Sequence, residues 1–474
     1  MTSRLLPCRP AHNNDRACPQ PRRMLFRSVV TTIAVGALVA ATTPASAAPS
    51  LARDAEAEAL IKDYLRPIFK VAGIRAQNMQ VFLVNDQSFN AFVANGQKIF
   101  VNVGAILNSE TPGELIGVLA HETAHVANGD LARFKQQMDS TKTAAILAAL
   151  AGMGAMVAGA VGGVGGLSQA GAGVAMGTSH VAQRSLLAYR RSQESEADRS
   201  AVAYLDKAGL SGAGMLKTFE HLADQSLFLS RNVNPYLLSH PLPRERLQAL
   251  EEIVKRSPNY GKKDSAELLR RHRMVQAKLA GFTWTPDRVS RKYGRTDNSP
   301  EARYARAISA LQNGPLSPAL RQIDALVQGS PSNPYYWELK GQALLENGRP
   351  AEAIAPLRKA VSLAPKSGLI LNLLGQALVA TERPGNLDEA IKILTLALQQ
   401  EPDMPVGYRS LARAYALKGD LPMADLATAQ GYFADGKVPD AKRHATRAQA
   451  KLKPNSPAWL RADDIVTYKA PRLR

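Results

Sequence analysis

The sequence has little cysteine and few aromatic residues for its length. Its 474 residues include two cysteines, Cys8 and Cys18, and 6% aromatic residues. Both cysteines precede an apolar run, Val29 to Ala41, so a chain cleaved after that run would contain no disulfide. No cysteine follows the run in a lipobox position, which argues against a lipoprotein anchor.

Basic residues outnumber acidic ones, yet few aromatic residues lie among them. The net charge is +19, and residues 1–47 hold six arginines and one aspartate, so +14 remains without them. Apart from the cluster 270–273, the basic residues are dispersed, and we therefore expect no nucleic-acid partner. A solvated basic surface explains the charge most simply. Attraction to an anionic membrane surface or to acidic clients is the alternative.

The N-terminal residues have the pattern of an export signal. Three arginines, the last of them Arg27, precede the apolar run, and Pro44-Ala45-Ser46-Ala47 ends it in a small-x-small cleavage pattern. This order predicts a secretory signal peptide over residues 1–47, with Met24 as an alternative start. A membrane anchor over residues 28–43 is the other interpretation, and the run is short for it.

The segment 114–130, ELIGVLAHETAHVANGD, contains the pattern H-E-x-x-H. Thr111 can cap a helix and apolar residues recur at helical spacing, so the pattern is expected in mid-helix. On a helix, His121 and His125 project from one face and can share a metal, while Glu122 points towards a metal-bound water. Two core histidines are the alternative, which is disfavoured because a buried ionisable His-Glu pair must be desolvated.

A second acidic segment offers the missing ligand. Two histidines leave a catalytic zinc one protein ligand short. In QESEADRSAVAYLDKAGL, residues 193–210, Glu194 and Asp198 are four residues apart and share a helix face, whereas Glu196 points elsewhere. One carboxylate can bind the metal, and the other can bind the far nitrogen of a ligating histidine.

A small sheet is expected before the histidine helix. Residues 51–75 are expected to be helical and Val81–Val84 to form a strand. Asn90–Leu107 is typical of a hairpin, with a turn at Asn95-Gly96 and alternation through the strand Ile99–Val103.

Residues 144–177 are almost wholly Ala, Gly, Val, Leu and Met. No charged residue lies between Lys142 and Arg184, and ten glycines fall between residues 152 and 177. Three interpretations remain open: a helical hairpin beside the active site, a membrane-dipping segment, or a buried element.

From about residue 301 the chain repeats with a period typical of tetratricopeptide helices. The first matching set is Trp337, Gly341, Leu344, Ala353, Leu357, Ala360 and Pro365, and the second is Leu371, Gly375, Leu378, Ala390, Leu394, Ala397 and Pro402. Such helix pairs bury their faces by stacking, and the resulting concave surface usually binds another polypeptide. Residues 261–300 are polar and basic and are interpreted as a connector.

Three motifs together resemble a known family. HETAH at 121–125, E-x-x-A-D at 194–198 and SHPLPRERL at 239–247 resemble the zinc metallopeptidases related to HtpX, Oma and the CAAX prenyl protease. A signal peptide before them and repeats after them resemble the periplasmic BepA-like branch, and the resemblance covers about residues 51–474. It implies zinc bound by the two histidines and Glu194, with Glu122 as the general base. Asn128-Gly129-Asp130 departs from the Arg-His more common in the BepA-like branch.

The loop motif H-P-x-x-x-x-R is matched by His240, Pro241 and Arg246. The resemblance implies that His240 can occupy the fourth zinc position and silence the enzyme. Stabilisation of the tetrahedral intermediate by His240 or Arg246 is the alternative, and a loop histidine without metal contact is the third. The resemblance also implies that the strand Ile99–Val103 aligns the substrate by adding it to the sheet.

We therefore expect an α+β protein in which a mainly helical zincin-type metallopeptidase domain with a small β-sheet (48–260) and a basic connector (261–300) precede an all-α tetratricopeptide solenoid (301–474). The expected function is a zinc endopeptidase, one Zn²⁺ per chain, that degrades misfolded or stalled envelope and outer-membrane proteins. The alternative is an outer-membrane assembly chaperone with suppressed proteolysis. The expected partners are polypeptide substrates, outer-membrane assembly proteins bound by the repeats, and a membrane surface. The expected location is the periplasm of a Gram-negative bacterium.

Overall fold

The computed structural model describes residues 51–75, 80–94, 98–130, 190–228 and 235–469, together with positions 133 and 136. These residues belong to one unit, Pro49–Arg474. The expected signal peptide, the Gly/Ala-rich segment 144–177 and the Asn95-Gly96 turn lie outside the described residues. Among the described helices, none combines the length and apolarity that a membrane span requires.

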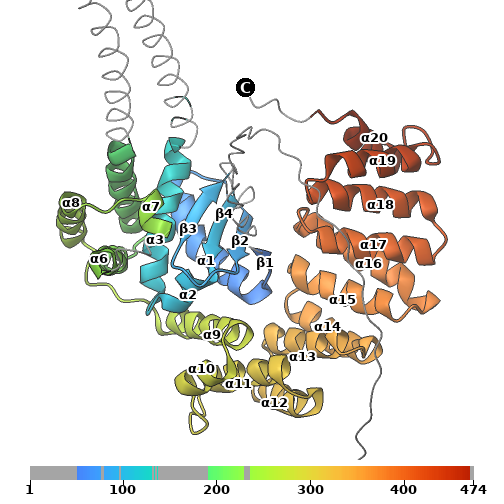
Figure 1. Ribbon diagram of the computed structural model, residues 1–474, viewed down its shortest axis with the longest axis horizontal. Coiled ribbons are helices and arrows are strands. Elements are labelled where there is room, and N and C mark those ends of the chain that lie inside the picture. Colours follow the sequence, from blue (N-terminus) through green and yellow to red (C-terminus); the bar gives the residue numbers. More distant parts are fainter. Residues whose placement is uncertain are drawn as a thin grey trace, which may run out of the picture. The chain divides into compact units, whose positions relative to one another are not determined.

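The first part of the chain builds a four-stranded sheet (Figure 1). Its strands are β1 (Leu51–Ala52), β2 (Gln80–Val84), β3 (Ala91–Ala94) and β4 (Lys98–Asn102). Their order is β1-β2-β4-β3, with β2 and β4 parallel and β3 antiparallel to β4. The predicted strand and the predicted hairpin are both confirmed.

The expectation for the strand Ile99–Val103 is wrong. This strand corresponds to β4, which lies between β2 and β3, so both of its backbone edges are already paired. Val103 begins the following helix instead of ending the strand. Among the described strands, β3 is the edge strand on this side, and it contacts the histidine-bearing helix α3.

Helices cover the sheet and carry the predicted motifs (Figure 1). They are α1 (Ala55–Ala72), α2 (Val103–Asn108), α3 (Pro112–Asn128), the helical residues 190–207, α6 (Ala213–Phe228), α7 (Pro235–Ser239) and α8 (Arg244–Lys255). We call residues 190–207 the Glu194 helix. One apolar core joins α1, β2, β4, α3 and α6, and it places the motif helices against the sheet.

The close approach of α3 and α6 depends on Gly214. A Cβ atom at this position would lie 2.3 Å from the backbone carbon of Gly113, which cannot move away as a flexible side chain can. Met215, the next residue, is fully buried beside α3. The separation between the two helices is therefore fixed by a residue without a side chain.

The C-terminal half is an array of paired helices, as the repeat pattern predicts. They are α11 (Pro300–Asn313), α12 (Leu316–Gly329), α13 (Pro334–Glu346), α14 (Pro350–Leu363), α15 (Gly368–Ala380), α16 (Pro384–Gln400), α17 (Pro405–Leu417), α18 (Leu421–Ala434), α19 (Val438–Gln449) and α20 (Pro457–Thr467). Six of them begin with proline, which fits the first turn of a helix because its missing N–H has no partner there. The expected α+β class is confirmed.

Residues 261–300, interpreted from sequence as a connector, contain two helices, α9 (Ala266–Thr283) and α10 (Pro286–Lys292). Helix α9 packs on α1 and on α11, so it contacts both the sheet domain and the repeats. Its Lys278 is 2% exposed, and its Nζ lies 2.8 Å from Asp54 Oδ2, 3.6 Å from Glu56 Oε2 and 3.4 Å from Glu338 Oε2. These three carboxylates surround one buried ammonium, and we call the four residues the Lys278 cluster.

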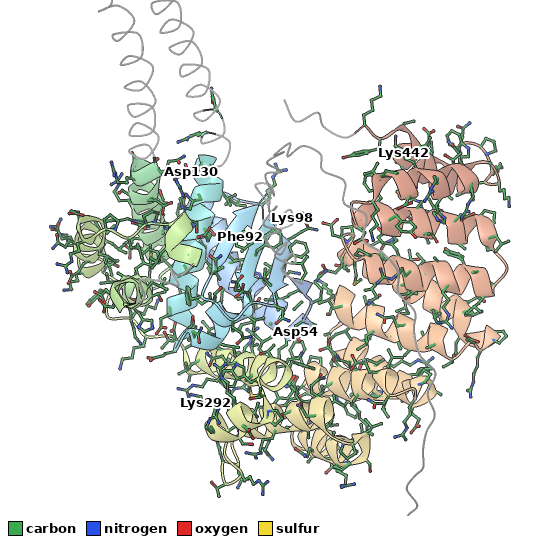
Figure 2. The ribbon with its side chains drawn as sticks, viewed as in Figure 1. Asp54, Phe92, Lys98, Asp130, Lys292 and Lys442 are labelled. Carbon is green, nitrogen blue, oxygen red and sulfur yellow. The ribbon has the colours of Figure 1, made fainter. Side chains whose placement is uncertain are left out.

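Ion pairs at two other positions join the sheet domain to the turn between α16 and α17. Arg53 lies 2.7 Å from Glu401, and Lys98 of β4 lies 2.6 Å from Asp403. Figure 2 shows Lys98 at the sheet and Asp54 at the beginning of α1.

We predict that Gly214→Ala lowers the free energy of unfolding by about 1–3 kcal/mol, because the added methyl group forces α3 and α6 apart. Thermal denaturation measures the effect. Gly261→Ala is the matched control, since a Cβ atom there meets nothing within 4 Å. Equal melting temperatures for the two variants would show that the helix spacing adapts without cost.

Candidate metal centre

Helix α3 places the two histidines of HETAH in mid-helix, as predicted. Thr111 is the N-cap residue, but its side chain makes no capping hydrogen bond. Instead, Glu114 in the first turn accepts a hydrogen bond from the backbone N–H of Glu110 at 2.9 Å. His121 is fully buried and His125 is partly buried, so both rings project towards the interior rather than into solvent.

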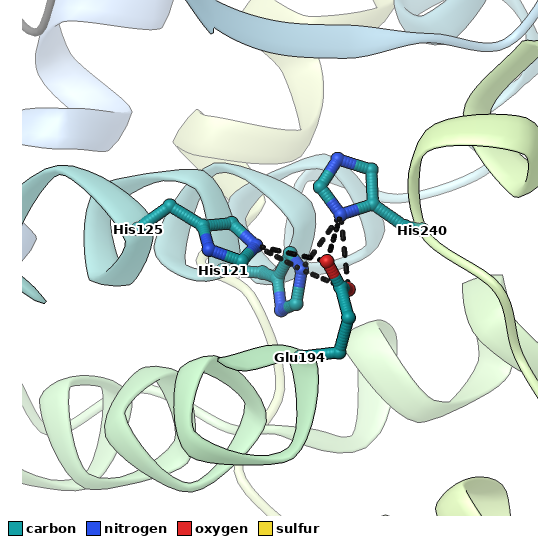
Figure 3. Close-up of side chains that lie close together, drawn as sticks. All are labelled: His121, His125, Glu194 and His240. Carbon is teal, nitrogen blue, oxygen red and sulfur yellow. Dashed lines mark hydrogen bonds and ion pairs between the residues drawn. The ribbon is translucent and has the colours of Figure 1, made fainter. Parts of the chain in front are cut away.

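Four side chains from three segments converge on one point (Figure 3). They are His121 and His125 of α3, Glu194 of the Glu194 helix, and His240, which follows α7. The Nε2 atoms of His121 and His125 are 3.1 Å apart, and Nδ1 of His240 lies 3.4 Å from His121 Nε2 and 3.0 Å from a carboxylate oxygen of Glu194. The Glu194 oxygens lie 3.4 and 3.6 Å from the Nε2 atoms of His121 and His125.

These separations match the donor set of a zinc ion. Ligand bonds of about 2.0–2.1 Å in a tetrahedral site imply donor–donor separations of roughly 3.3–3.4 Å. The donor pairs described above span 3.0 to 3.6 Å, and all four donor atoms lie within 4.8 Å of one another. Three imidazoles and one carboxylate are also the donor types that zinc prefers. The residues therefore fit a zinc ion.

The electrostatics of the cluster favour a bound cation. Burial lowers the pKa of His121, but hydrogen bonds to Asp198 and Glu194 outweigh it and raise the pKa to about 9. Burial raises the pKa of Glu194, but its hydrogen bonds to His121 and His240 hold it well below the usual range. The ionised carboxylate thus attracts positive charge to the centre, either as a proton on the imidazole or as a metal ion.

Each histidine of α3 has a carboxylate behind it. Nδ1 of His121 lies 3.0 Å from Asp198 Oδ1, the contact expected from sequence for a carboxylate that orients a ligand. Nδ1 of His125 lies 2.7 Å from Asp130 Oδ2. Both contacts leave Nε2 facing the other donors and fix the ring orientation.

Asp130 is a functional residue that the motifs did not predict. The residue follows Gly129, the C-cap of α3, whose φ of 68° turns the chain back towards the helix. Figure 2 shows Asp130 at this end of α3. The Gly-Asp pair directly after HETAHVAN was the signal: glycine supports the left-handed turn, and the next side chain then lies within reach of the last histidine.

Arg246 contacts the carboxylates instead of a substrate position. Its Nε and Nη2 donate to Asp198 at 2.5 and 2.8 Å, and its Nη1 lies 2.9 Å from Glu194 and donates to the carbonyl of Pro241 at 2.8 Å. The side chain is buried and these partners engage all three of its nitrogens. In this arrangement Arg246 joins Glu194 and Asp198 to the His240 loop.

His240 faces both the donor cluster and the predicted base. Its Nδ1 lies among the donors, while its Nε2 lies 3.4 Å from Oε1 of Glu122. Tyr236 of α7 stacks on the imidazole with ring centroids 4.7 Å apart, and the backbone N–H of His240 donates to the Tyr236 carbonyl at 2.7 Å. Tyr236 was not found from sequence, although the spacing of four residues on a helical turn permits such a contact.

Comparison with known proteins matches residues 53–254 to peptidase family M48 and residues 304–368 to the tetratricopeptide repeat. The region matched to family M48 includes all four converging donors, and the repeat match begins within α11.

Several curated relatives carry a common name. The chain is 27% identical over 259 residues to the putative beta-barrel assembly-enhancing protease of Vibrio cholerae, covering 54% of this chain and 52% of the relative. It is 26% identical over 261 residues to the beta-barrel assembly-enhancing protease of Escherichia coli K12, with the same coverage. For the protein of that name from Yersinia pestis, 26% identity extends over 81% of this chain and 77% of the relative. The chain thus spans about half the length of the first two relatives.

We predict that Glu194→Ala loses zinc because it removes the only carboxylate among the four converging donors. Metal analysis of the purified protein measures the effect. Glu196→Ala, an exposed residue of the same helix, is the matched control and should keep one zinc per chain. Full zinc content in Glu194→Ala would refute the assignment of this ligand.

We predict that Asp198→Asn weakens zinc retention about 10- to 100-fold, the usual effect of losing a partner of a ligating histidine. Asp130→Asn should weaken it less, since Asp198 also pairs with Arg246. Competition with a chelator measures both constants. Retention equal to that of Glu196→Gln would show that the carboxylates do not orient the ligands.

Proposed function

We propose that the chain is a zinc-dependent endopeptidase of the bacterial cell envelope. The observation that carries the proposal is the convergence of His121, His125 and Glu194 beside Glu122 within an M48 domain. We further propose that its substrates are misfolded or stalled envelope and outer-membrane proteins, which the repeats hold. The name of the relatives supports an envelope role, and the repeats support binding of another polypeptide. The expected export signal supports a periplasmic location.

The chemistry of hydrolysis follows from the residues around the cluster. Bound zinc would supply Lewis acidity towards the scissile carbonyl. Glu122 is 2% exposed and projects beside the histidine face of α3, so it can take a proton from the attacking water and return it to the leaving amine. Asp198 and Asp130 keep the two imidazoles oriented while charge develops, and Arg246 keeps Glu194 and the His240 loop in place.

In the described arrangement the site is closed rather than ready for water. Catalytic zinc sites keep one position open, whereas sites with four protein ligands are typical of structural zinc. His240 supplies a fourth donor, and its other nitrogen lies beside the base Glu122. We propose that His240 suppresses hydrolysis until the loop that carries it moves away.

A polypeptide client can be aligned by the edge strand β3. This strand pairs with β4 on one side, contacts α3, and among the described strands has no partner on its other side. An extended segment could add there as a further strand, with its backbone held near the histidine helix. The strand predicted for this role, Ile99–Val103, has both edges paired and cannot take it.

A second candidate function is an assembly chaperone whose proteolysis is mostly suppressed. The closed set of four donors favours this alternative, because a protein resting in this state binds clients more often than it cleaves them. The Glu122→Gln variant distinguishes the two functions. It should retain zinc and client binding in both cases, and it impairs envelope protein turnover only if hydrolysis is the function.

We predict that His240→Ala cleaves unfolded protein substrates faster than the wild type, since the fourth position is then open to water. The increase should disappear when Glu122→Gln is added. Cleavage of an unfolded reporter protein and zinc content are measured together, with His221→Ala, an exposed histidine of α6, as the control. An inactive His240→Ala that retains zinc would mean that His240 assists the reaction instead of blocking it.

A further inference from the structure

A large cavity lies between the Glu194 helix and α8. Its volume is about 1020 Å³, at the upper end of the roughly 300–1,000 Å³ typical of ligand sites. Its aliphatic lining consists of Leu237, Leu242, Ala249, Leu250 and Ile253, and charged residues such as Arg190, Arg191, Arg199, Glu245 and Glu252 line it as well. Leu250 belongs to the main core, and Leu237, Leu242 and Ile253 pack against that core.

The cavity shares its wall with the metal centre. Glu194, Asp198 and Arg246 line it, and these are the three residues that join the donor cluster to its supporting ion pairs. The segment Pro241–Pro243, which directly follows His240, lines it as well. Glu194 therefore belongs both to the donor cluster and to the wall of the cavity.

We propose that this cavity binds an apolar segment of the client polypeptide and thereby selects the position of cleavage. The inference rests on the proposed peptidase function. The occupant is a polypeptide because the cavity shares Glu194 with the donor cluster of the proposed peptidase, and it is apolar because aliphatic side chains line the cavity. Two prolines in the lining segment, Pro241 and Pro243, also have no N–H groups to donate.

Occupancy of the cavity also bears on His240. The carbonyl of Pro241 accepts a hydrogen bond from Arg246, and this contact ties the His240 loop to the Glu194 helix. An apolar segment that enters beside Leu242 contacts the loop directly behind His240. Binding energy from the segment can therefore shift the loop between its closed and open positions.

A binding experiment tests the site without requiring cleavage. The full chain carrying Glu122→Gln is titrated with two fluorescein-labelled peptides of glycine and serine, one with three central leucines and one with three central asparagines. We expect the leucine peptide to bind at least about tenfold more tightly, the size expected for burying one large apolar side chain. A photoreactive leucine in the same peptide should crosslink to residues within 237–253.

A matched pair of variants locates the binding. Ala249 and Gln248 are neighbouring exposed residues of α8, and only Ala249 lines the cavity. Ala249→Trp fills the cavity and should remove the preference for leucine, while Gln248→Trp should keep it. Equal affinities of the two variants for the leucine peptide, or crosslinks confined to the repeats, would overturn the proposal. Binding of oleate that the leucine peptide cannot displace would also overturn it, because Arg190, Arg191 and Arg199 in the lining would then serve a lipid carboxylate.

Failure of this site is distinguishable from failure of the proposed function. Cleavage sites in an unfolded protein are mapped by mass spectrometry with His240→Ala, alone and combined with Ala249→Trp. Cleavage at unchanged sites in the combined variant would reject the cavity but keep the peptidase function. Leucine-dependent binding in the cavity without cleavage by either protein would reject the peptidase function but keep the cavity as a binding site.

Discussion

The buried guanidinium of Arg246 holds the site together. It pairs with Asp198 and Glu194 and donates to the carbonyl of Pro241, so one side chain links the Glu194 helix, the His240 loop and the start of α8. Buried carboxylates need such a partner, because an uncompensated charge in the protein interior is strongly destabilising. The carboxylate of Glu194 also faces the histidines. Its negative charge therefore favours binding of a cation between these residues.

This arrangement gives a physical reason for the closed state proposed for the metal centre. The same loop provides an anchor for Arg246 and a fourth donor, His240, so closure of the loop completes both the ion-pair network and the donor set. Opening the loop breaks the contact to Pro241 but leaves the two contacts to Asp198 intact. The Glu194 helix can therefore stay in position while His240 moves, and the ligands on α3 keep their carboxylate partners.

The sequence predicted those parts of the structure that depend on local spacing. The helical period of 3.6 residues predicted the helix of HETAH and the shared face of Glu194 and Asp198. The strand period of two residues predicted the hairpin, and the repeat of 34 residues predicted the tetratricopeptide pairs. All three periods can be read without knowing any tertiary contact. The strand order could not be predicted, because the parallel pairing of β4 with β2 skips β3 and depends on tertiary packing. That pairing placed β4 inside the sheet and made β3 the edge.

The sequence predicted which residues form the site, but it did not predict which side chains contact them. His121, His125, Glu194 and His240 converge as the motifs suggest. The partner of Arg246 could not be deduced, since an arginine six residues after a histidine can face a substrate or a carboxylate equally well. Asp130 and Tyr236 were missed for a related reason: each contacts a histidine through a turn or a short helix whose geometry is set by packing.

The Lys278 cluster has a consequence for how the chain acquires its structure. Tyr304 of α11 donates a hydrogen bond to Glu56 across 248 residues of sequence, and Glu338 of α13 lies farther still along the chain. Burial raises the pKa of Glu56, so this carboxylate depends on the partners that α9 and the repeats bring. Helix α1 thus completes its polar contacts only after the first repeats have emerged. Such long-range contacts slow folding, and they make assembly of the region that carries the donor cluster depend on the repeats that follow it.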